Sequence, residues 1–217
     1  MAEAAKKSEE RYEEKDKILE YAYSRFIAEG FFKTTMDELA NELGVSKKTI
    51  YKYFPSKEKL VEDIAEGIIS QTKCDMEEVI DAKTDVVSKF VKILDVYNSK
   101  IIRCSEKWYR DLQIHTPHIW KRIEKIRSEK IYESLGKLIK QGKREGLIAG
   151  YPPEIVITSF IAMVRSVMNP DFIMQNKFSM KEAFEYSFEM LLNGILTTQG
   201  KNKYFSQRRK DSKEVNG

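Results

Sequence analysis

The sequence contains few of the residues on which secreted, metal-binding and catalytic proteins depend. Its 217 residues include two cysteines, two histidines, five prolines and ten glycines. Cys74 and Cys104 form no C-x-x-C pair, which argues against a disulfide-built secreted domain and predicts two reduced, buried thiols. His115 and His118 lie on either side of Pro117 with no carboxylate or cysteine cluster beside them, so no metal site is expected.

Catalytic motifs and long apolar runs are missing as well. The sequence has no nucleophile and base at a catalytic spacing and no glycine-rich phosphate loop, so we predict neither an enzyme nor a cofactor. The longest apolar run, 155–164, is about half the length that spans a bilayer. Residues 1–17 lack the apolar stretch of a signal peptide. We therefore predict a cytoplasmic protein that makes no membrane contact.

Helical spacing of apolar residues runs along most of the chain. Ile18, Ala22 and Phe26 recur on one helical face, and Gly30 follows as a C-cap. No strand pattern or internal repeat competes, so we predict an all-α fold of about nine helices in two unequal parts. The expected helices cover residues 12–29, 35–43, 46–54, 57–80, 84–103, 105–115, 118–145, 153–168 and 179–196.

Capping residues support several of these helix starts. Thr35 with Glu38, and Ser179 with Glu182, fit the capping box, in which a hydroxyl and a glutamate three residues later each bind a backbone amide of the other. Ser46 is a good N-cap for the short helix that follows Gly44.

The sign of the charge reverses within the N-terminal region. Residues 1–45 carry seven basic and eleven acidic side chains, whereas 46–59 carry five lysines and only Glu58 as an acid. This reversal predicts an anion-attracting patch confined to 46–59. The alternative is an ordinary solvated helix face.

A helix-turn-helix is predicted around Gly44. Ala40 is small enough for close helix approach, Gly44 can adopt positive φ in the turn, and apolar residues on both sides fill the angle between the helices. With the apolar side chains turned inward, lysines, hydroxyls and a phenol remain outward on the second helix, as suits a major groove. The outward side chains are Lys47, Lys48, Thr49, Tyr51 and Lys52.

The stretch "TTMDELANELGVSKKTIYKYFPSKEKL", residues 34–60, resembles the DNA-binding signature of the TetR (tetracycline repressor) family of bacterial regulators. Lys48 departs from the family, which often has a small residue there. The resemblance implies that ten residues contact double-stranded DNA, with phosphate contacts fixing register and base contacts specifying sequence. They are Thr34, Thr35, Ser46, Lys47, Lys48, Thr49, Tyr51, Lys52, Tyr53 and Lys57. For Tyr53, inward packing of the ring is an open alternative, and Phe54 is expected in the core.

The resemblance also implies a homodimer that reads a palindrome. Independently, 155–168 has more apolar surface than one helix face needs, so one side is expected to meet a partner in a four-helix interface. A single thick monomeric core is the alternative. The predicted interface residues are Ile155, Ile161, Met168, Phe184, Phe188, Leu191, Leu192 and Ile195.

The resemblance further implies a pocket for a small-molecule effector in the larger domain. The predicted lining residues are Tyr97, Ile101, Arg103, Trp108, Leu112, Phe160, Met163, Val164, Val167 and Phe172. Each apolar residue has plain core packing as its alternative. Arg103 and Arg165 are each candidates to bind an acidic ligand. The alternative for both is an ion pair or a solvent-exposed position.

Together these features predict four segments. Residues 200–217 carry six basic and two acidic groups and no apolar pattern, which indicates a disordered basic tail. The segments are a disordered N-terminus at 1–11, a helix-turn-helix domain at 12–56, a ligand-binding and dimerisation domain at 57–199, and the tail at 200–217.

The expected function is a ligand-responsive transcriptional regulator. We predict a repressor because most members of the family that it resembles are repressors. It is expected to leave its palindromic operator when an effector of unknown identity binds. A helical protein-interaction module that does not read DNA is the rival. A steep salt dependence of nucleic-acid binding separates the two, because only the DNA reader needs the face of lysines and hydroxyls.

Overall fold

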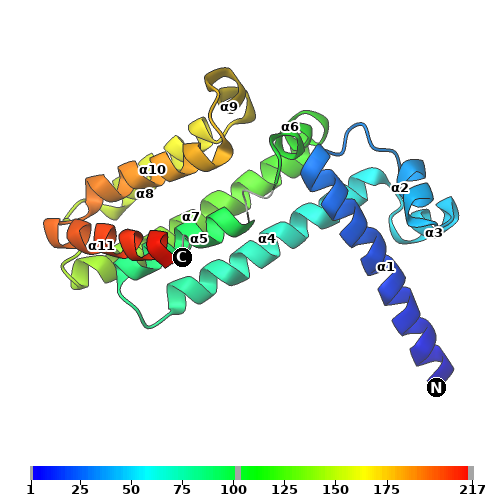
Figure 1. Cartoon of the computed structure of the whole chain (residues 1–217), viewed down its shortest axis with the longest axis horizontal. Helices are drawn as coiled ribbons and strands as arrows, with labels where there is room; N and C mark the ends of the chain where they lie inside the picture. The colour runs from blue at the N-terminus through cyan, green and yellow to red at the C-terminus, as the bar shows by residue number, and fades with distance from the viewer. Residues whose placement is uncertain (1, 101–103, 215–217) are drawn as a thin grey trace. The chain divides into compact units, whose positions relative to one another are not determined.

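A computed structural model of the chain describes residues 2–100 and 104–214 (Figure 1). Within these ranges the chain forms eleven α-helices, and the β pairing is limited to one isolated antiparallel bridge between Ile148 and Leu196. The helices are α1 (Ala2–Glu29), α2 (Met36–Leu43), α3 (Lys47–Tyr53), α4 (Lys57–Asp81), α5 (Val86–Lys100), α6 (Glu106–His115), α7 (Pro117–Arg144), α8 (Pro153–Val167), α9 (Pro170–Asn176), α10 (Met180–Ile195) and α11 (Thr198–Glu214). The predicted all-α class is confirmed.

The helices assemble into two compact units, each built from two stretches of chain. The first unit comprises Met1–Ser70 and Arg103–Ile123, and the second comprises Gln71–Ile102 and Glu124–Gly217. The predicted boundary at residue 56 differs from this division. The whole of α6 and the first turns of α4 and α7 belong to the N-terminal unit.

The first unit has one core, to which α6 contributes large apolar side chains. Trp108 and Leu112, each 1% exposed, pack in the same cluster as Phe26, Leu39 and Ile50. Trp108 and Leu112, predicted to line an effector pocket of the larger domain, are thus core residues of the N-terminal unit. Aromatic and leucine residues at helical spacing look the same in any core, and the sequence does not show which core receives them.

The second unit is centred on an aromatic cluster, where α8 packs against α10. The ring centroid of Phe188 lies 5.9 Å from that of Phe90, 6.0 Å from Phe160 and 5.6 Å from Phe184. Tyr97 stacks on Phe184. Such aromatic pairs stabilise the core beyond the area that they bury.

Two helices exceed the predicted nine. α9 has only seven residues, between the Asn169 cap and Lys177 at φ 57°, and is too short to show helical periodicity in the sequence. α11 covers most of the segment predicted to be a disordered tail, so that prediction is wrong for 200–214.

α11 packs against α5 by means that leave no apolar pattern. Tyr204 is 4% exposed, Lys203 pairs with Asp85 at 2.9 Å, and Gln207 donates to Ser88 Oγ at 2.9 Å. One buried aromatic ring with polar contacts around it gives no periodic signal.

The predicted disordered N-terminus at 1–11 is wrong for residues 2–11, which continue α1. Alanine, lysine, glutamate and arginine dominate this stretch and all favour helix. Met1 lies outside the described residues. Among the residues described, no single helix is long and apolar enough to cross a membrane, and α8 with α9 reaches that length only with a 63° bend between them.

Candidate nucleic-acid interface

Local capping fixes the two helices of the predicted helix-turn-helix. Thr35 Oγ1 accepts the amide of Glu38 at 3.1 Å, and Glu38 Oε2 accepts the amide of Thr35 at 2.7 Å, so the predicted capping box is confirmed. Gly44 ends α2 in the left-handed region at φ 66°, which favours glycine. Ser46 then caps α3, its Oγ accepting the amide of Thr49 at 3.1 Å.

The apolar side of the motif is anchored in the first unit's core. Leu39, Ile50 and Phe54 are fully buried, and Ala40 is 1% exposed. The buried positions confirm the predicted inward side of both helices. With these residues inward, α3 turns Lys47, Lys48, Tyr51 and Lys52 to solvent, while Thr49 is half-buried.

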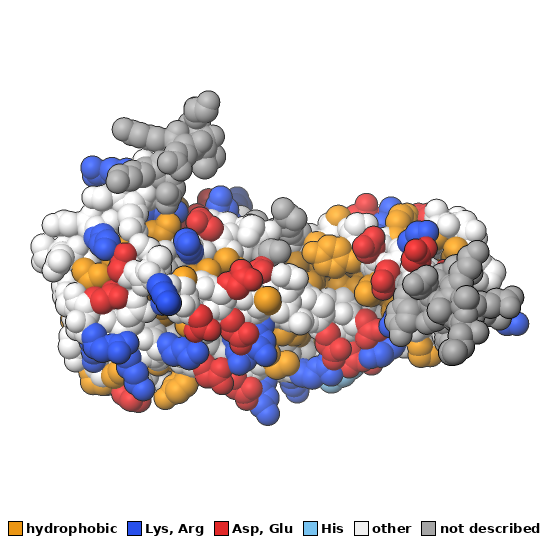
Figure 2. Space-filling view, turned by 90° about the horizontal axis from the view of Figure 1, so that it is seen from below, with side chains coloured by type: hydrophobic (Ala, Val, Ile, Leu, Met, Phe, Trp, Pro, Cys, Tyr) orange, Lys and Arg blue, Asp and Glu red, His pale blue; other side chains and the backbone are white. Residues whose placement is uncertain are grey.

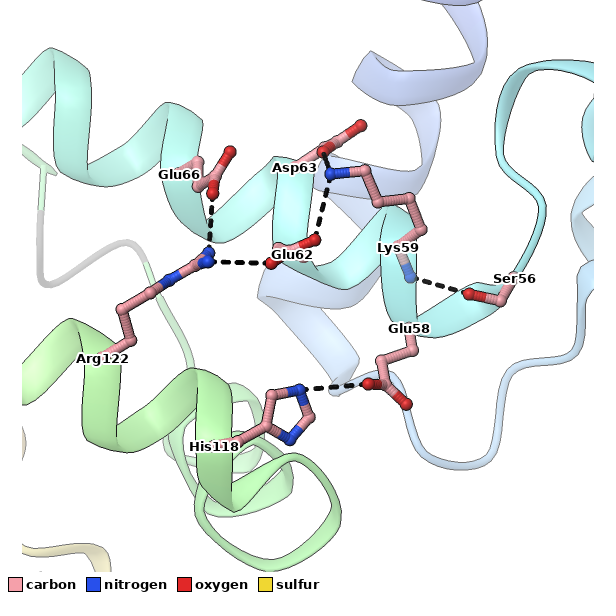
Figure 3. Close-up of polar contacts among 8 residues, drawn as sticks. All are labelled: Ser56, Glu58, Lys59, Glu62, Asp63, Glu66, His118 and Arg122. Carbon is pink, nitrogen blue, oxygen red and sulfur yellow. Dashed lines mark hydrogen bonds and ion pairs between the residues drawn. The ribbon is translucent and has the colours of Figure 1, made fainter.

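Two lysines of the predicted patch are already paired with acids from neighbouring turns. Lys47 forms an ion pair with Asp37 of α2. Lys59 lies 3.0 Å from Glu62 and 2.8 Å from Asp63 (Figure 3). The hydrogen bonds to Asp63 and Glu62 raise the pKa of Lys59, and its own hydrogen bond lowers that of Glu62.

The patch therefore carries less free positive charge than a count along the sequence suggests. Lys48 has no ion-pair partner among the residues described, and Lys52 donates to the Tyr53 hydroxyl at 3.0 Å. Figure 2 shows the same mixing of signs over one face of the molecule, with Lys and Arg side chains beside Asp and Glu side chains. Lys48 and Lys52 are the lysines of α3 that no carboxylate neutralises within the described ranges.

Lys57, predicted to contact phosphate, is engaged with protein carbonyls. Its Nζ donates to the backbone carbonyls of Phe31 at 3.1 Å, Phe32 at 2.9 Å and Thr34 at 3.0 Å. Burial lowers the pKa of Lys57. An ammonium has three protons to donate, and these three carbonyls accept them.

Two other predicted contacts also point away from solvent. Thr34 is 8% exposed, so Thr35 is the accessible threonine of the pair. Tyr53 packs against the core, and its hydroxyl donates to Glu14 of α1 at 2.7 Å. The structure thus favours the inward alternative for Tyr53.

The structure reveals an ion-pair cluster between α4 and α7 that sequence reasoning missed (Figure 3). Arg122 contacts Glu62 at 2.9 Å and Glu66 at 2.6 Å, and His118 Nε2 lies 3.0 Å from Glu58. The acids follow each other at four-residue spacing, as do the two basic residues, so each set lies on one helix face. Matching stripes of this kind are the signal that could have predicted the contact.

The predicted effector residues of the second unit do not form one uniform set. Tyr97, Phe160 and Val164 are buried, Met163 and Val167 are half-buried, and Phe172 on α9 is exposed. Ile101 and Arg103 lie outside the described residues. Arg165 is exposed and donates to Ser128 Oγ at 2.8 Å, which agrees with the surface alternative.

Five of the predicted interface residues are buried in the core of their own unit and offer almost no surface to a partner. They are Met168, Phe184, Phe188, Leu192 and Ile195. Ile161 and Leu191 are half-buried, and Ile155 is 64% exposed. Tyr186 and Met190 on α10, which the sequence prediction did not include, are 57% and 67% exposed.

A capped helix, a glycine turn and a second short helix with a basic outer face define a helix-turn-helix protein. Residues 18–64 match the family described as bacterial regulatory proteins, tetR family. This match identifies residues 18–64 as the DNA-binding region typical of TetR-family transcriptional regulators.

Three similar proteins align with most of the chain. An HTH-type transcriptional regulator of Bacillus subtilis (strain 168), YvaF, is 25% identical over 179 residues, which are 79% of this chain and 90% of that protein. The nucleoid occlusion factor SlmA of Vibrio vulnificus is 24% identical over 171 residues, 76% of this chain and 86% of that one. A transcriptional regulator of Cytophaga hutchinsonii has the same fold, with a TM-score of 0.64 at 20% identity over 84% of this chain and 98% of the other.

Proposed function

We propose that the chain is a repressor that binds a palindromic operator as a homodimer, with α3 of each copy in a major groove. The observation that carries the proposal is the division of α3 into a buried side, fixed by Ile50, and a wet side with Lys48, Tyr51 and Lys52. Lysine and phenol groups on an exposed recognition helix can reach both base edges and phosphates.

A second copy is required for tight and selective binding. The few lysines of one motif neutralise only a handful of phosphates, which gives weak and salt-sensitive association. A two-fold symmetric dimer presents two α3 helices to half-sites about 34–36 Å apart.

The exposed side of α8 and α10 supports self-association. Ile155, Tyr186 and Met190 are large apolar residues that are more than half exposed. On α8 the exposed positions next to Ile155 in helical register are occupied by small residues, which allow close helix approach. They are Thr158, Ser159, Ala162 and Ser166. An exposed apolar face of this kind is a candidate protein interface.

An effector in the second unit is supported by one unsatisfied polar atom near its aromatic cluster. Asn98 Oδ1 is buried without a hydrogen-bond partner among the described residues. A largely apolar ligand with one hydrogen-bond donor would satisfy this oxygen. Such a ligand lowers the affinity for DNA if it prefers the conformation that cannot span two half-sites.

The test is selection of duplexes from a random library, followed by gel shifts at several salt concentrations. We expect a palindrome with two half-sites one helical turn apart, bound by a dimer. Recovery of no preferred duplex contradicts the operator proposal. If a duplex is selected but no apolar ligand from a screen shifts the band of the folded protein, the effector part fails alone.

A further inference from the structure

One face of α6 is turned toward the loop between α1 and α2, residues 30–35. Trp108, Asp111 and His115 recur at three- and four-residue spacing and so share that face. The Trp108 ring packs edge-on against Phe31 at 5.5 Å. The His115 ring stacks on Phe32 with centroids 3.6 Å apart and planes 6° from parallel.

Asp111, between these two rings, binds the backbone of the same loop. Its Oδ2 accepts the amide of Phe31 at 2.7 Å and that of Phe32 at 2.8 Å. Gly30 has φ 80°, and a Cβ added there would lie 2.5 Å from Oδ2 of Asp111. The carboxylate therefore rests directly on the loop backbone, and glycine is needed both for the conformation and for the space.

Lys57 binds the same loop backbone through its carbonyl oxygens. It donates to the carbonyls of Phe31, Phe32 and Thr34, while Asp111 accepts from the amides of Phe31 and Phe32. The peptide group between Phe31 and Phe32 is thus bound at its amide by a negative side chain and at its carbonyl by a positive one. Hydrogen bonds to charged groups are stronger than neutral ones, so the pair fixes the loop firmly.

The helix that carries Lys57 is fixed independently. Arg122 and His118 of α7 bind the acidic stripe on α4 through Glu58, Glu62 and Glu66 (Figure 3). The anchor of Lys57 therefore does not depend on Asp111, and the loop has two separate attachments.

The loop leads directly into the reading motif. It ends at Thr35, whose hydroxyl caps α2, and α2 leads through Gly44 into α3. A shift of the loop backbone would change where α2 starts and would carry α3 with it. The position of α3 on DNA thus depends on the side chain of α6 that holds the loop.

We propose that Asp111 is a positioning residue for DNA reading, which acts through the α1–α2 loop and touches no DNA itself. This inference rests on the proposed sequence-specific binding. It makes α6 the element that sets the register of α2 and α3, with Lys57 as the fixed counterpart on α4. Specific binding needs that register, whereas non-specific binding needs only positive charge near phosphate.

The experiment compares Asp111→Asn with Glu106→Gln in the full-length protein. Both variants remove one negative charge from α6, and within the described residues Glu106 does not contact the loop. Affinity is measured for a duplex selected by the wild type and for an unselected duplex. Hydrogen exchange of the Phe31 and Phe32 amides is followed in the same preparations.

We expect Asp111→Asn to speed exchange of both amides and to lower the ratio of selected to unselected affinity roughly tenfold. Glu106→Gln should leave exchange and ratio unchanged. Inactive protein lowers both affinities in proportion, so the ratio is insensitive to partial unfolding.

If Asp111→Asn leaves the affinity ratio unchanged, with or without faster amide exchange, the inference is overturned. The same holds if both affinities fall in proportion. A wild-type protein that shows no preference for any duplex overturns the proposed function first and the inference with it. A wild type with a clear preference that Asp111→Asn retains overturns the inference alone.

Discussion

Lys47 at the start of α3 forms an ion pair with Asp37 in the first turn of α2, across the turn of the helix-turn-helix. Both side chains are about half or more exposed, so the pair adds only about 0–1 kcal/mol to stability. Its larger effect concerns DNA, because Asp37 competes with phosphate for the Lys47 ammonium.

Asp37→Asn should therefore strengthen binding to unselected DNA and steepen its salt dependence. One additional phosphate contact steepens the slope of log affinity against log salt by about 0.9. Glu20→Gln on α1 is the control, since it removes one acid that has no lysine partner among the described residues. Equal slopes for the two variants contradict the competition between Asp37 and phosphate.

The two capping boxes allow a matched comparison of stability and function. Thr35→Ala and Ser179→Ala each remove an N-cap hydroxyl from the same local geometry. Each should lower the free energy of unfolding by about 1 kcal/mol in a urea titration. Only Thr35→Ala should also weaken binding to selected DNA, because Thr35 starts the helix that leads into α3. Loss of DNA affinity in Ser179→Ala beyond its effect on stability would oppose this division.

The parts of this molecule that sequence predicts are those fixed by neighbours in the chain. Gly44, Ser46 and the Thr35 capping box act within a few residues, and the structure has each where it is expected. The buried side of α3 follows from its periodicity for the same reason.

The parts that sequence does not predict depend on contacts between distant segments. Lys57 looks like a phosphate ligand until the carbonyls of the α1–α2 loop are placed around it. Trp108 packs in the N-terminal core because α6 joins the first unit. Tyr186 and Met190 lie on the exposed side of α10, whereas Phe184 and Phe188 lie on its buried side. All four side chains are large and mainly apolar, so their residue types do not show which side of the helix is buried.

The glutamates of the capping boxes should make stability depend on acid pH. The backbone amide of Thr35 lowers the pKa of Glu38 below its ordinary value of 4.5, and that of Ser179 does the same for Glu182. A carboxylate with a lowered pKa in the folded state stabilises the fold above its unfolded pKa and loses that contribution as the pH falls through the folded value.

The free energy of unfolding should thus decline as the pH drops below about 4.5, and the double variant Glu38→Gln, Glu182→Gln should decline less. Urea titrations across this range measure both slopes. An identical decline in the double variant and the wild type would show that other carboxylates dominate.

Self-association through α8 and α10 predicts a sharp effect of charge at Met190. Met190→Glu should convert the dimer to monomer in sedimentation experiments, because burying an unpaired carboxylate in an apolar interface is costly. Tyr132→Glu is the control, since Tyr132 is 49% exposed on α7 and lies outside the proposed interface. Dimers that survive Met190→Glu, or that Tyr132→Glu dissolves equally, place the interface elsewhere.

Lys48 and Lys57 should separate base reading from loop support. Lys48→Ala removes an exposed side chain from α3, so it should change the preferred base at one position of each half-site and shift stability by less than about 0.5 kcal/mol. Lys57→Met leaves three carbonyls without their donor and should cost about 1–3 kcal/mol of stability. Selection experiments read the first effect, and urea titrations read the second.

The salt dependence of DNA binding by Lys57→Met decides whether Lys57 contacts phosphate or supports the loop. A phosphate contact at Lys57 would make Lys57→Met flatten the salt slope while stability stays near that of the wild type. Donation to the α1–α2 loop predicts the reverse, because the ammonium is already engaged with protein carbonyls and contributes no phosphate contact. A flattened slope with unchanged stability would return Lys57 to the role of phosphate clamp, and the Asp111 proposal would lose the fixed counterpart on which its geometry depends.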